Sequence, residues 1–329
     1  MSKSFDENVA LFDRLFSGKM DEDEAKNLLV TLYHEGESAN QIAAAAKVMR
    51  EHSIKLEISD ELRDRLIDNC GTGGDKSNSF NISTTASLLL SSCGSYVAKH
   101  GNRSITSKSG SADMLEELGI NLDLNPQEQV KMLEDLGFTF LFAQNHHPAM
   151  KYIMPIRRSL SHRTIFNILG PLTNPAGVKR QLIGVFSKDY IVKIAEALKL
   201  LECDSALVVS SKDGMDEISI CDITYGVYLH EDRIEEVIID PQEFGMRLAN
   251  KEQIAGSNPK ENAKITKSIL EGEIRDARRD VVLLNAGAAL MVDGKARDIK
   301  EGIEIAKDAI DSGSAKSRLR KIVEVSNRL

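Results

Sequence analysis

The chain has 329 residues, of which 42% are hydrophobic, so it is long enough to fold as one large or two smaller domains around a sizeable core. Its formal net charge of −8 argues against binding of nucleic acid through bulk charge, because such binding needs a basic surface that displaces counterions. The four cysteines are widely spaced without a C-x-x-C pair, so we expect reduced thiols in a soluble, cytoplasmic protein with no membrane span.

The N-terminal part of the chain is predicted to be helical. Apolar residues recur there at helical spacing, as at Leu11, Leu15 and Phe16, and no stretch alternates as a strand would. Ser59, followed by acidic residues, predicts the start of one more helix. We expect two domains. The first is a helical domain over 1–68, to which helices from about 147–178 also belong, and the second is an α/β domain over 69–329.

From residue 65 onward, short β-branched runs alternate with helical segments. The expected strands are 65–70, 96–98, 138–142, 182–186 and 206–210, with helices such as 112–118 and 189–201 between them. Such alternation is typical of βαβ units and predicts a mainly parallel sheet. The segment 147–175 has no strand signal and is expected to be a helical excursion.

The last part of the chain begins with residues 218–239, where apolar residues alternate around a predicted turn at His230-Glu-Asp-Arg233. This pattern predicts antiparallel strands. Helices are expected over 261–271, 278–292 and 299–328, with Gly294 and Gly313 as breaks. The expected fold class is α/β, with a small all-helical domain and a larger domain whose mainly parallel central sheet is flanked by helices.

The segment Cys70-Gly-Thr-Gly-Gly-Asp-Lys76 follows the first predicted strand and precedes a helix expected to begin near Asn81, with Ser83 and Thr84 in its first turn. Glycines allow positive φ and leave backbone N–H groups uncovered, and the helix dipole adds positive potential, so this pattern is typical of a phosphate site. An ordinary surface turn is the alternative. The segment matches neither G-x-x-x-x-G-K-[ST] nor G-x-G-x-x-G, which disfavours a nucleotide triphosphatase or an NAD enzyme.

A second polar cluster, Lys99-His-Gly-Asn-Arg-Ser104, follows the predicted strand 96–98, at the sheet edge where parallel strands open onto a ligand crevice. Lys99 offers a cation for phosphate, Arg103 a planar donor fork, and Asn102 an amide for sugar hydroxyls or a carboxylate. A solvated basic turn is the alternative. Further on, Ser107-Lys-Ser-Gly-Ser111 precedes a helix and is either a second anion site or a plain helix cap formed by Ser111.

The adjacent carboxylates Asp216 and Glu217 follow the predicted strand 206–210. Two carboxylates at a ligand edge repel each other unless a cation joins them, and magnesium suits a substrate that brings phosphates. Ser83 is a candidate for a further ligand, while a solvated acidic turn is the alternative. With phosphate binding and sugar-hydroxyl donors, this pair suits the departure of pyrophosphate from an activated sugar.

His147 and an arginine about three helical turns later, Arg157, are candidates to flank an aromatic or carboxylate-bearing substrate, with Arg158 as the neighbouring alternative. The histidines lack the spacing of a zinc site. No nucleophile elbow and no activated cysteine is evident, so covalent catalysis is not expected.

Six motifs occur in order along nearly the whole chain. They are Gly71-Thr-Gly-Gly-Asp75, Asn81-Ile-Ser-Thr84, Lys99-His-Gly-Asn-Arg103, His147-Pro-Ala-Met150, Asn167-Ile-Leu-Gly-Pro-Leu-Thr-Asn-Pro175 and Asp216-Glu217. In this arrangement the chain resembles the anthranilate phosphoribosyltransferases of tryptophan biosynthesis. The resemblance implies transfer of the phosphoribosyl group of phosphoribosyl pyrophosphate (PRPP) to the amine of anthranilate, by a cytoplasmic homodimer with two magnesium ions per subunit.

Carried over residue by residue, the resemblance implies three sets of contacts. PRPP would be held by Gly71, Thr72, Gly74, Asp75, Asn81, Ser83, Thr84, Lys99 and Ser111. The anthranilate site would be lined by Gly71, His100, Asn102, His147, Arg157, Gly170 and Pro171, with Arg157 as the partner of the anthranilate carboxylate. Magnesium would be held by Ser83, Asp216 and Glu217. No catalytic nucleophile is implied.

Three alternatives stay open. A nucleoside phosphorylase of related architecture would cleave a pyrimidine nucleoside with inorganic phosphate, but the segment 166–175 and the Asp216-Glu217 pair favour the transferase. A non-catalytic relative that binds nucleic acid is disfavoured by the acidic charge. Transfer to another aromatic amine or acid is excluded only weakly, because one or two contacts in the acceptor region can change acceptor choice.

Overall fold

The computed structural model describes residues 3–104 and 108–329 and is built around a seven-stranded sheet in the order β3-β2-β1-β4-β5-β6-β7. Five strands run parallel, and they are β1 (Leu66–Gly71), β2 (Tyr96–Gly101), β3 (Phe138–Phe142), β4 (Arg180–Gly184) and β5 (Ser205–Ser211). The antiparallel strands are β6 (Thr224–His230) and β7 (Arg233–Ile239). The predicted fold class, with a mainly parallel sheet flanked by helices, is confirmed.

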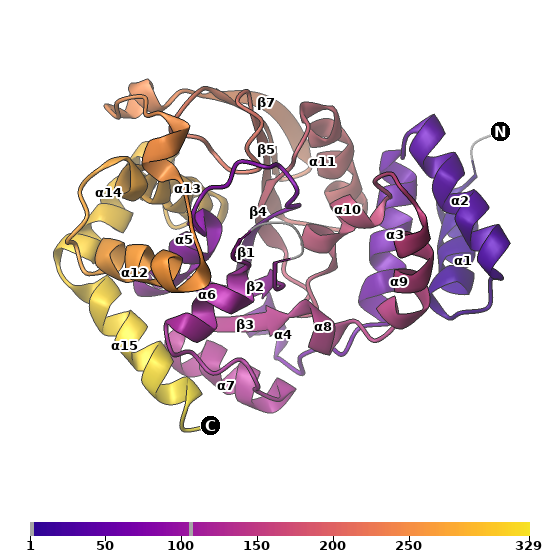
Figure 1. Cartoon of the computed structure of the whole chain (residues 1–329), viewed down its shortest axis with the longest axis horizontal. Coiled ribbons are helices and arrows are strands. Elements are labelled where there is room, and N and C mark those ends of the chain that lie inside the picture. Colours follow the sequence, from indigo (N-terminus) through magenta and orange to yellow (C-terminus); the bar gives the residue numbers. More distant parts are fainter. Residues whose placement is uncertain (1–2, 105–107) are drawn as a thin grey trace.

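One group of helices gathers at the right of Figure 1, beside the sheet. It comprises α1 (Phe5–Phe16), α2 (Glu22–Glu35), α3 (Ala39–Glu51) and α9 (Met150–Ser159). Ser4, Asp21 and Ser38 cap the first three helices with side-chain hydrogen bonds, which explains where each begins. These helices share a core with α10 (Phe166–Leu169) and α11 (Ile191–Leu200), and that core continues onto the sheet through β4 and β5.

The division into domains at residues 68 and 69 stays a prediction. Strand β1 begins at Leu66, ahead of that boundary, and is preceded by the short helix α4 (Asp60–Arg63), which Ser59 caps as expected. Contacts of α9 with α1 and α2 bring the chain after His147 back to the N-terminal helices. The shared core means that no break in packing marks the boundary.

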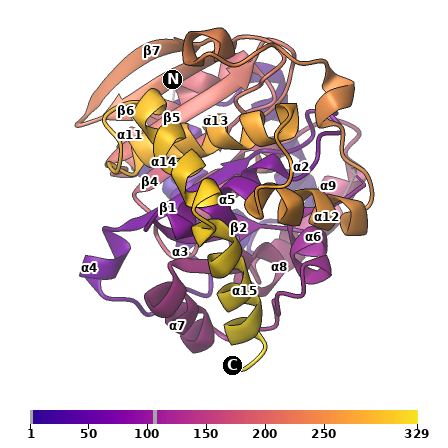
Figure 2. The same ribbon diagram turned by 90° about the vertical axis from the view of Figure 1, so that its left-hand side faces the viewer.

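The opposite face of the sheet is covered by a second set of helices, which Figure 2 shows from its own side. They are α5 (Ile82–Ser92), α6 (Ser111–Glu117), α7 (Pro126–Leu136), α12 (Pro259–Leu270), α13 (Ala277–Val292), α14 (Ile299–Asp311) and α15 (Ser314–Ser326). Alternation along the strands divides the two cores, since Leu182 and Leu207 enter this one while Ile183 and Val208 enter the other.

Most predicted strands and helices are present, and the departures have local causes. The predicted turn after His230 holds Glu231 and Asp232 at positive φ, as a two-residue hairpin turn requires. Helix α7 was not predicted, although Asn125, Pro126 and Glu128 form a recognisable helix start there.

The remaining short elements lie in the connections between strands and longer helices. They are α8 (Ala143–His146), η1 (Gly170–Thr173), η2 (Lys188–Tyr190), η3 (Pro241–Phe244) and η4 (Lys251–Ile254). Of these, η1 lies with α9 and α10 in the segment 147–175, which was predicted to be a helical excursion, while α8 lies just before that segment. Over the described part of the chain, no helix is both long enough and apolar enough to cross a membrane.

Candidate functional site

The glycine loop between β1 and α5 presents a row of backbone amides without partners. Gly73 and Gly74 have φ values of 70° and 75°, which glycine adopts at little cost. Within the described part of the chain, the amides of Gly74, Asp75 and Lys76 donate to no protein acceptor. Successive free N–H groups in such a turn form an anion-binding concavity, and the N-terminus of α5 follows shortly after. This local structure is the one that the phosphate hypothesis requires.

Asp216 packs against this loop and against the ends of two strands. Its Oδ2 accepts a hydrogen bond of 2.6 Å from the amide of Gly73. A Cβ atom on Gly71 would lie 2.2 Å from Asp216 Oδ2, and one on Gly184 would lie 1.7 Å from Asp216 O, so only glycine fits at either position. Sequence reasoning singled out Gly71 for its turn and missed Gly184, whose requirement arises from a contact between distant segments.

The predicted acidic pair lies beside the loop and the first turn of α5. Asp216 is buried, and its amide donates to Asp75 Oδ2 at 3.3 Å. Glu217 Oε1 accepts a hydrogen bond of 3.2 Å from the amide of Ser83. The alternative of a solvated acidic turn is therefore wrong.

Burial disfavours the charged form of both carboxyl groups in this pair. It raises the pKa of Asp216 well above its ordinary value, and the negative charges of Asp75 and Glu217 raise that pKa further. Burial also raises the pKa of Glu217 to about 7, although the nearby cation of Lys99 acts in the opposite direction. Lys99 therefore compensates the two negative charges only in part, and a bound cation would supply further positive charge.

The donor set of the pair fits magnesium better than a self-contained metal site. Over residues 3–104 and 108–329, no group of three or more His, Cys, Asp and Glu side chains could hold a metal ion by itself. Magnesium typically takes one or two carboxylates and completes its shell with water and substrate phosphate oxygens. Asp216 and Glu217 match that pattern, because they lie next to a predicted phosphate loop. Ser83 is adjacent to the pair, since its amide donates to Glu217.

Lys99 and His100 lie inside β2, which continues to Gly101 and so extends beyond the predicted strand. Lys99 is 1% exposed and its Nζ donates to Asn69 O in the neighbouring strand β1 at 2.5 Å. A solvated basic turn is therefore wrong as a description of these two residues. Near the same ammonium group lies Asp68, whose pKa is raised by burial while Lys99 lowers it.

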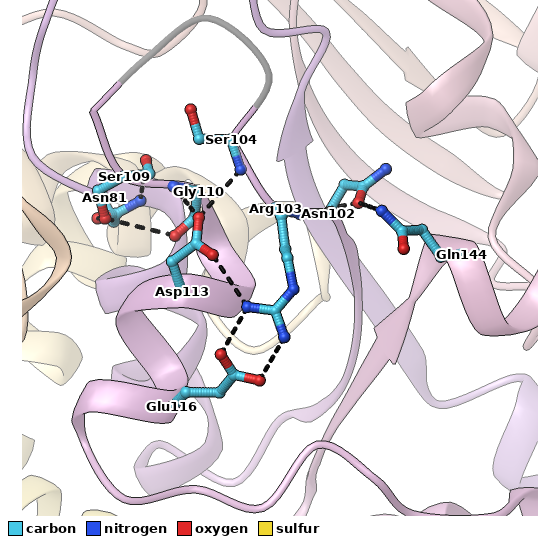
Figure 3. Close-up of polar contacts among 9 residues, drawn as sticks. All are labelled: Asn81, Asn102, Arg103, Ser104, Ser109, Gly110, Asp113, Glu116 and Gln144. Atoms are coloured by element: carbon cyan, nitrogen blue, oxygen red, sulfur yellow. Dashed lines mark hydrogen bonds and ion pairs between the residues drawn. The ribbon is translucent and has the colours of Figure 1, made fainter. Parts of the chain in front are cut away.

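Arg103 is engaged by carboxylates of α6, as Figure 3 shows. Its guanidinium contacts Glu116 through two hydrogen bonds of 2.6 Å and Asp113 Oδ1 through one of 3.0 Å. The expectation that Arg103 presents a free donor fork to substrate is thus wrong for this conformation. Asn102 Oδ1 accepts from the amide of Arg103 at 2.8 Å and from Gln144 Nε2 at 3.4 Å.

The N-termini of α5 and α6 lie side by side next to the glycine loop. Thr84, in the first turn of α5 as predicted, donates from Oγ1 to Ser111 Oγ at 2.9 Å. Gly110 occupies the N-cap position of α6 and Ser111 is its first residue, so the alternative of a plain cap formed by Ser111 is wrong. Ser107, which belongs to the same predicted anion segment, lies outside the described residues.

The side chain of Asn81 is occupied by neighbouring protein groups. Its Nδ2 donates to Ser109 O at 3.2 Å, and its Oδ1 accepts from Ser109 Oγ and from Asn262 Nδ2 at 3.0 and 2.9 Å. The connection between the two helix N-termini is therefore held by a polar network that spans α5, α6 and α12.

His100 and His147 form a buried pair whose hydrogen bonds define their tautomers. His100 Nδ1 lies 3.0 Å from Gly170 O, and because a carbonyl only accepts, this nitrogen carries the proton. His100 Nε2 then accepts from His147 Nε2 at 3.1 Å. His147 Nδ1 is left as a bare lone pair, and it has no partner among the described residues.

Both histidines of this pair are neutral at pH 7. Burial lowers the pKa of His147 to about 4, with His146 adding to the shift, and burial lowers the pKa of His100 well below its ordinary value. Of the other predicted acceptor residues, Gly170 is exposed, and Pro171 is buried with its carbonyl bound by Gln181 Nε2 at 2.7 Å. The predicted acceptor region therefore consists of the neutral His100–His147 pair and of backbone carbonyls at Gly170 and Pro171 that are held by hydrogen bonds.

Arg157 and Arg158 differ in their surroundings. The guanidinium of Arg157 lies 5.5 Å from the ring centroid of Phe166 and is partly buried, and burial lowers its pKa. Arg158 is exposed. Of the two arginines, Arg157 is the one that faces the interior.

Sequence reasoning missed several residues that order the site. Asn174 donates from Nδ2 to Asp68 Oδ2 at 2.9 Å and to Ala98 O at 2.7 Å, and so joins β1 to β2 below the ligand edge. Arg163 donates from Nη2 to Gly74 O at 2.7 Å. Asn174 lies in the motif 167–175, and its place in that motif is the only sequence feature that pointed to it. Nothing in the sequence singled out Arg163.

Comparisons with known proteins agree on one family. Residues 63–316 match the glycosyl transferase family, a/b domain. The anthranilate phosphoribosyltransferase of Methanobrevibacter smithii is 46% identical over 98% of this chain and 94% of its own length. The crystal structure of the Thermus thermophilus anthranilate phosphoribosyltransferase superposes with a TM-score of 0.92 at 38% identity, covering 99% of this chain and 97% of that one.

The anthranilate phosphoribosyltransferase of Saccharomyces cerevisiae has solved structures with substrate-like ligands. Its complex with PRPP and Mg gives a TM-score of 0.87 at 29% identity, over 98% of this chain and 92% of that one. Its complex with 4-fluoroanthranilate gives a TM-score of 0.87 at 27% identity, over 99% of this chain and 94% of that one.

Proposed function

The chain belongs to the anthranilate phosphoribosyltransferase family, and on this basis we propose that its glycine loop and its Asp216–Glu217 pair together hold PRPP and magnesium. The chain transfers the phosphoribosyl group of PRPP to the amine of anthranilate, giving N-(5-phosphoribosyl)anthranilate and pyrophosphate in tryptophan biosynthesis. The nucleoside phosphorylase and the non-catalytic nucleic-acid-binding relative are set aside.

One observation carries the assignment of the donor site. The free amides of Gly74, Asp75 and Lys76 lie next to two carboxyl groups, of which Asp216 is buried and bonded to the loop itself. Anion donors and metal ligands are thus adjacent, as a pyrophosphate carrying magnesium requires. The further PRPP contacts are assigned to Gly71, Thr72, Asn81, Ser83, Thr84, Lys99 and Ser111.

Magnesium is assigned to Asp216 and Glu217, with Ser83 as a further ligand. When bound, magnesium would offset the negative charge that develops on the departing pyrophosphate. We propose two ions per subunit, as the resemblance to the family implies. The Mg in the yeast complex with PRPP supports the identity of the metal.

The acceptor side is assigned to the region around the histidine pair. Arg157 is the proposed partner of the anthranilate carboxylate, because it lies on the interior side of α9 beside an aromatic ring. His147 offers a bare lone pair to an N–H donor, and His100 holds His147 in that tautomer. The remaining contacts are assigned to Gly71, Asn102, Gly170 and Pro171.

This arrangement needs no catalytic nucleophile. The amine of anthranilate is neutral at pH 7, so its lone pair attacks C1 of the ribose directly while the C1–O bond breaks and pyrophosphate leaves from the opposite side. The nitrogen then loses one proton to water and becomes the neutral amine of the product. Holding the two substrates in line supplies about 7 to 11 kcal/mol, and the amides of the glycine loop stabilise charge on the leaving group. The protein therefore acts by positioning and by electrostatic stabilisation.

The assignment is tested by the loss of anthranilate fluorescence after mixing the protein with PRPP and magnesium. The wild-type protein is expected to give a magnesium-dependent loss, and an Asp216→Asn/Glu217→Gln variant to give at most about one-hundredth of that rate, because its metal ligands are neutral. An equally fast, magnesium-dependent variant would show that the metal lies elsewhere. Parallel reactions with other aromatic amines test the breadth of acceptor choice.

We further propose a cytoplasmic homodimer that assembles through the helical layer. Large apolar side chains are exposed there, namely Tyr33, Ile54, Tyr152, Val192 and Leu200. Exposed apolar side chains of this size are often covered at an interface between copies. All four cysteines are free, which suits a reducing compartment. Light scattering on the purified protein tests the assembly, with a double variant at Tyr152 and Leu200 expected to weaken it.

A further inference from the structure

Arg163 connects the acceptor-side excursion to the glycine loop. It lies between α9 and α10, and its Nη2 donates to Gly74 O at 2.7 Å. Its guanidinium carbon lies 3.7 Å from the ring centroid of Phe186, directly after β4. A planar cation stacked on an aromatic ring has a defined orientation, so this contact directs the guanidinium at the loop.

Each half of the loop is anchored by its own hydrogen bonds. The amide of Thr72 donates to Gly184 O at 2.9 Å, and Thr72 Oγ1 accepts from the amide of Phe186 at 3.2 Å. The amide of Gly73 is taken by Asp216. The second half of the loop, where the free amides are, is held by two contacts. Asp75 Oδ2 accepts from the amide of Asp216 at 3.3 Å, and Gly74 O accepts from Arg163.

The geometry of a trans peptide gives this contact a directional consequence. In a trans peptide the C=O and the following N–H point in opposite directions. Because Arg163 binds Gly74 O, the amide of Asp75 in the same peptide plane points away from Arg163. That amide is one of the free donors of the loop, so the orientation of Arg163 sets the direction of a phosphate donor.

The surroundings of Arg163 hold it in place from the helical layer. Phe186 contacts Tyr190 edge to face at 5.5 Å between ring centroids, and the hydroxyl of Tyr190 donates to the buried Glu37 at 3.0 Å. The preceding residue, His162, stacks on Tyr33 of α2 with centroids 4.1 Å apart. The segment 162–163 is thus packed on the helical layer at one end and on the glycine loop at the other.

We propose that Arg163 is a positioning residue for PRPP, which fixes the Gly74–Asp75 peptide so that its amide faces the bound phosphates. The inference rests on the proposed assignment of PRPP to the glycine loop. It adds a residue outside the predicted contacts, and it explains how the acceptor-side segment reaches the donor site. Arg163 acts on substrate through the loop, so its effect should appear in the use of PRPP.

The experiment compares Arg163→Ala and Arg163→Lys with wild type by steady-state kinetics against each substrate and by thermal unfolding. Arg163→Ala is expected to raise the KM for PRPP about tenfold, the effect of losing one charge-assisted hydrogen bond, with the KM for anthranilate and the unfolding midpoint nearly unchanged. Arg163→Lys should recover part of this loss, because its ammonium still donates. Arg275→Ala, at an exposed arginine, is the matched control.

A Gly74→Ala variant separates failure of this inference from failure of the site assignment. If Gly74→Ala raises the KM for PRPP and Arg163→Ala does not, the loop binds PRPP and the role of Arg163 is wrong. If neither variant changes the KM for PRPP, the assignment of PRPP to the loop fails, and the inference about Arg163 fails with it. The inference is also overturned if Arg163→Ala raises the KM for anthranilate and leaves the KM for PRPP unchanged. Should Arg163→Ala not fold, Phe186→Leu is expected to show a smaller effect in the same direction, and no effect there would contradict the inference.

Discussion

The proposed donor end of the site, at Asp216 and Glu217, and the proposed acceptor end, at His100 and His147, lie largely away from water, yet they respond to burial in opposite directions. Burial raises the pKa of both carboxyl groups, that of Glu217 to about 7. It lowers the pKa of both histidines, that of His147 to about 4. In each case the neutral form is the one favoured.

The two ends differ in how completely the protein satisfies them. The histidine pair passes its hydrogen bonds from His147 to His100 to Gly170 O, and one lone pair, on His147 Nδ1, has no partner in the part of the chain that the structure describes. The acidic pair has two negative groups side by side and requires a cation to be stable in charged form. The acidic pair therefore depends on added positive charge for its ionised form, whereas the histidine pair is a preformed neutral surface.

The largest effect is expected at the acceptor end, in the response of stability to acid. Because the pKa of His147 is about 4 in the folded protein and near 6.5 in the unfolded chain, the unfolded state binds the proton more readily between these values. The stabilisation is fully present above pH 6.5 and is lost as the pH falls towards 4, by up to about 3 kcal/mol. A His147→Gln variant should lose less stability over this range, as measured by urea unfolding.

The control for this prediction is His230→Gln, at an exposed histidine on the hairpin of β6 and β7. Its unfolding free energy should follow that of the wild type at every pH. If the His147→Gln variant also follows the wild type from pH 7 to pH 4, His147 is not the source of the acid sensitivity.

At the donor end, Lys99→Met removes the buried cation while keeping much of its volume. The ammonium of Lys99 is bonded to Asn69 O of β1, lies near Glu217, and is the proposed partner of a PRPP phosphate. Its loss should raise the KM for PRPP by about tenfold to hundredfold, the range of a charge-assisted hydrogen bond. Steady-state kinetics measure this, with the exposed Lys264→Met as control. An unchanged KM would remove Lys99 from the donor site.

A comparison of Arg157→Ala with Arg158→Ala tests the acceptor end more finely. The interior position of Arg157 predicts a rise of about tenfold in the KM for anthranilate, since its carboxylate would lose one charged partner. Arg158→Ala should change that KM by less than about twofold, because the side chain faces solvent. The reverse order of effects would move the carboxylate contact to Arg158.

The smallest effect is expected from Arg103→Gln. Its guanidinium is already bonded to Asp113 and Glu116, so little donor capacity remains for substrate. The KM for PRPP should change by less than about threefold, because exposed ion pairs contribute about 1 kcal/mol or less. A change of tenfold or more would restore Arg103 as a substrate ligand and would imply that the ion pairs open on binding.

Much of the fold could be predicted because its signals are local. β-branched runs predicted the strands, Ser59 predicted a helix start, and the residues after His230 predicted a hairpin turn. The glycine loop was recognisable because its conformation depends on its own residues. By contrast, nothing local distinguishes Arg163 from any other surface arginine.

The amino-acid sequence by itself determined the order of the elements, the glycine-rich turn and the family, because these depend on local periodicity and on short ordered motifs. Only the tertiary structure decided that Arg103 is paired with α6, that Gly184 must admit Asp216, and that Arg163 reaches Gly74. Each of these depends on two segments far apart in the chain meeting within a few ångströms. Such contacts form only when the sheet and its two helical layers pack together.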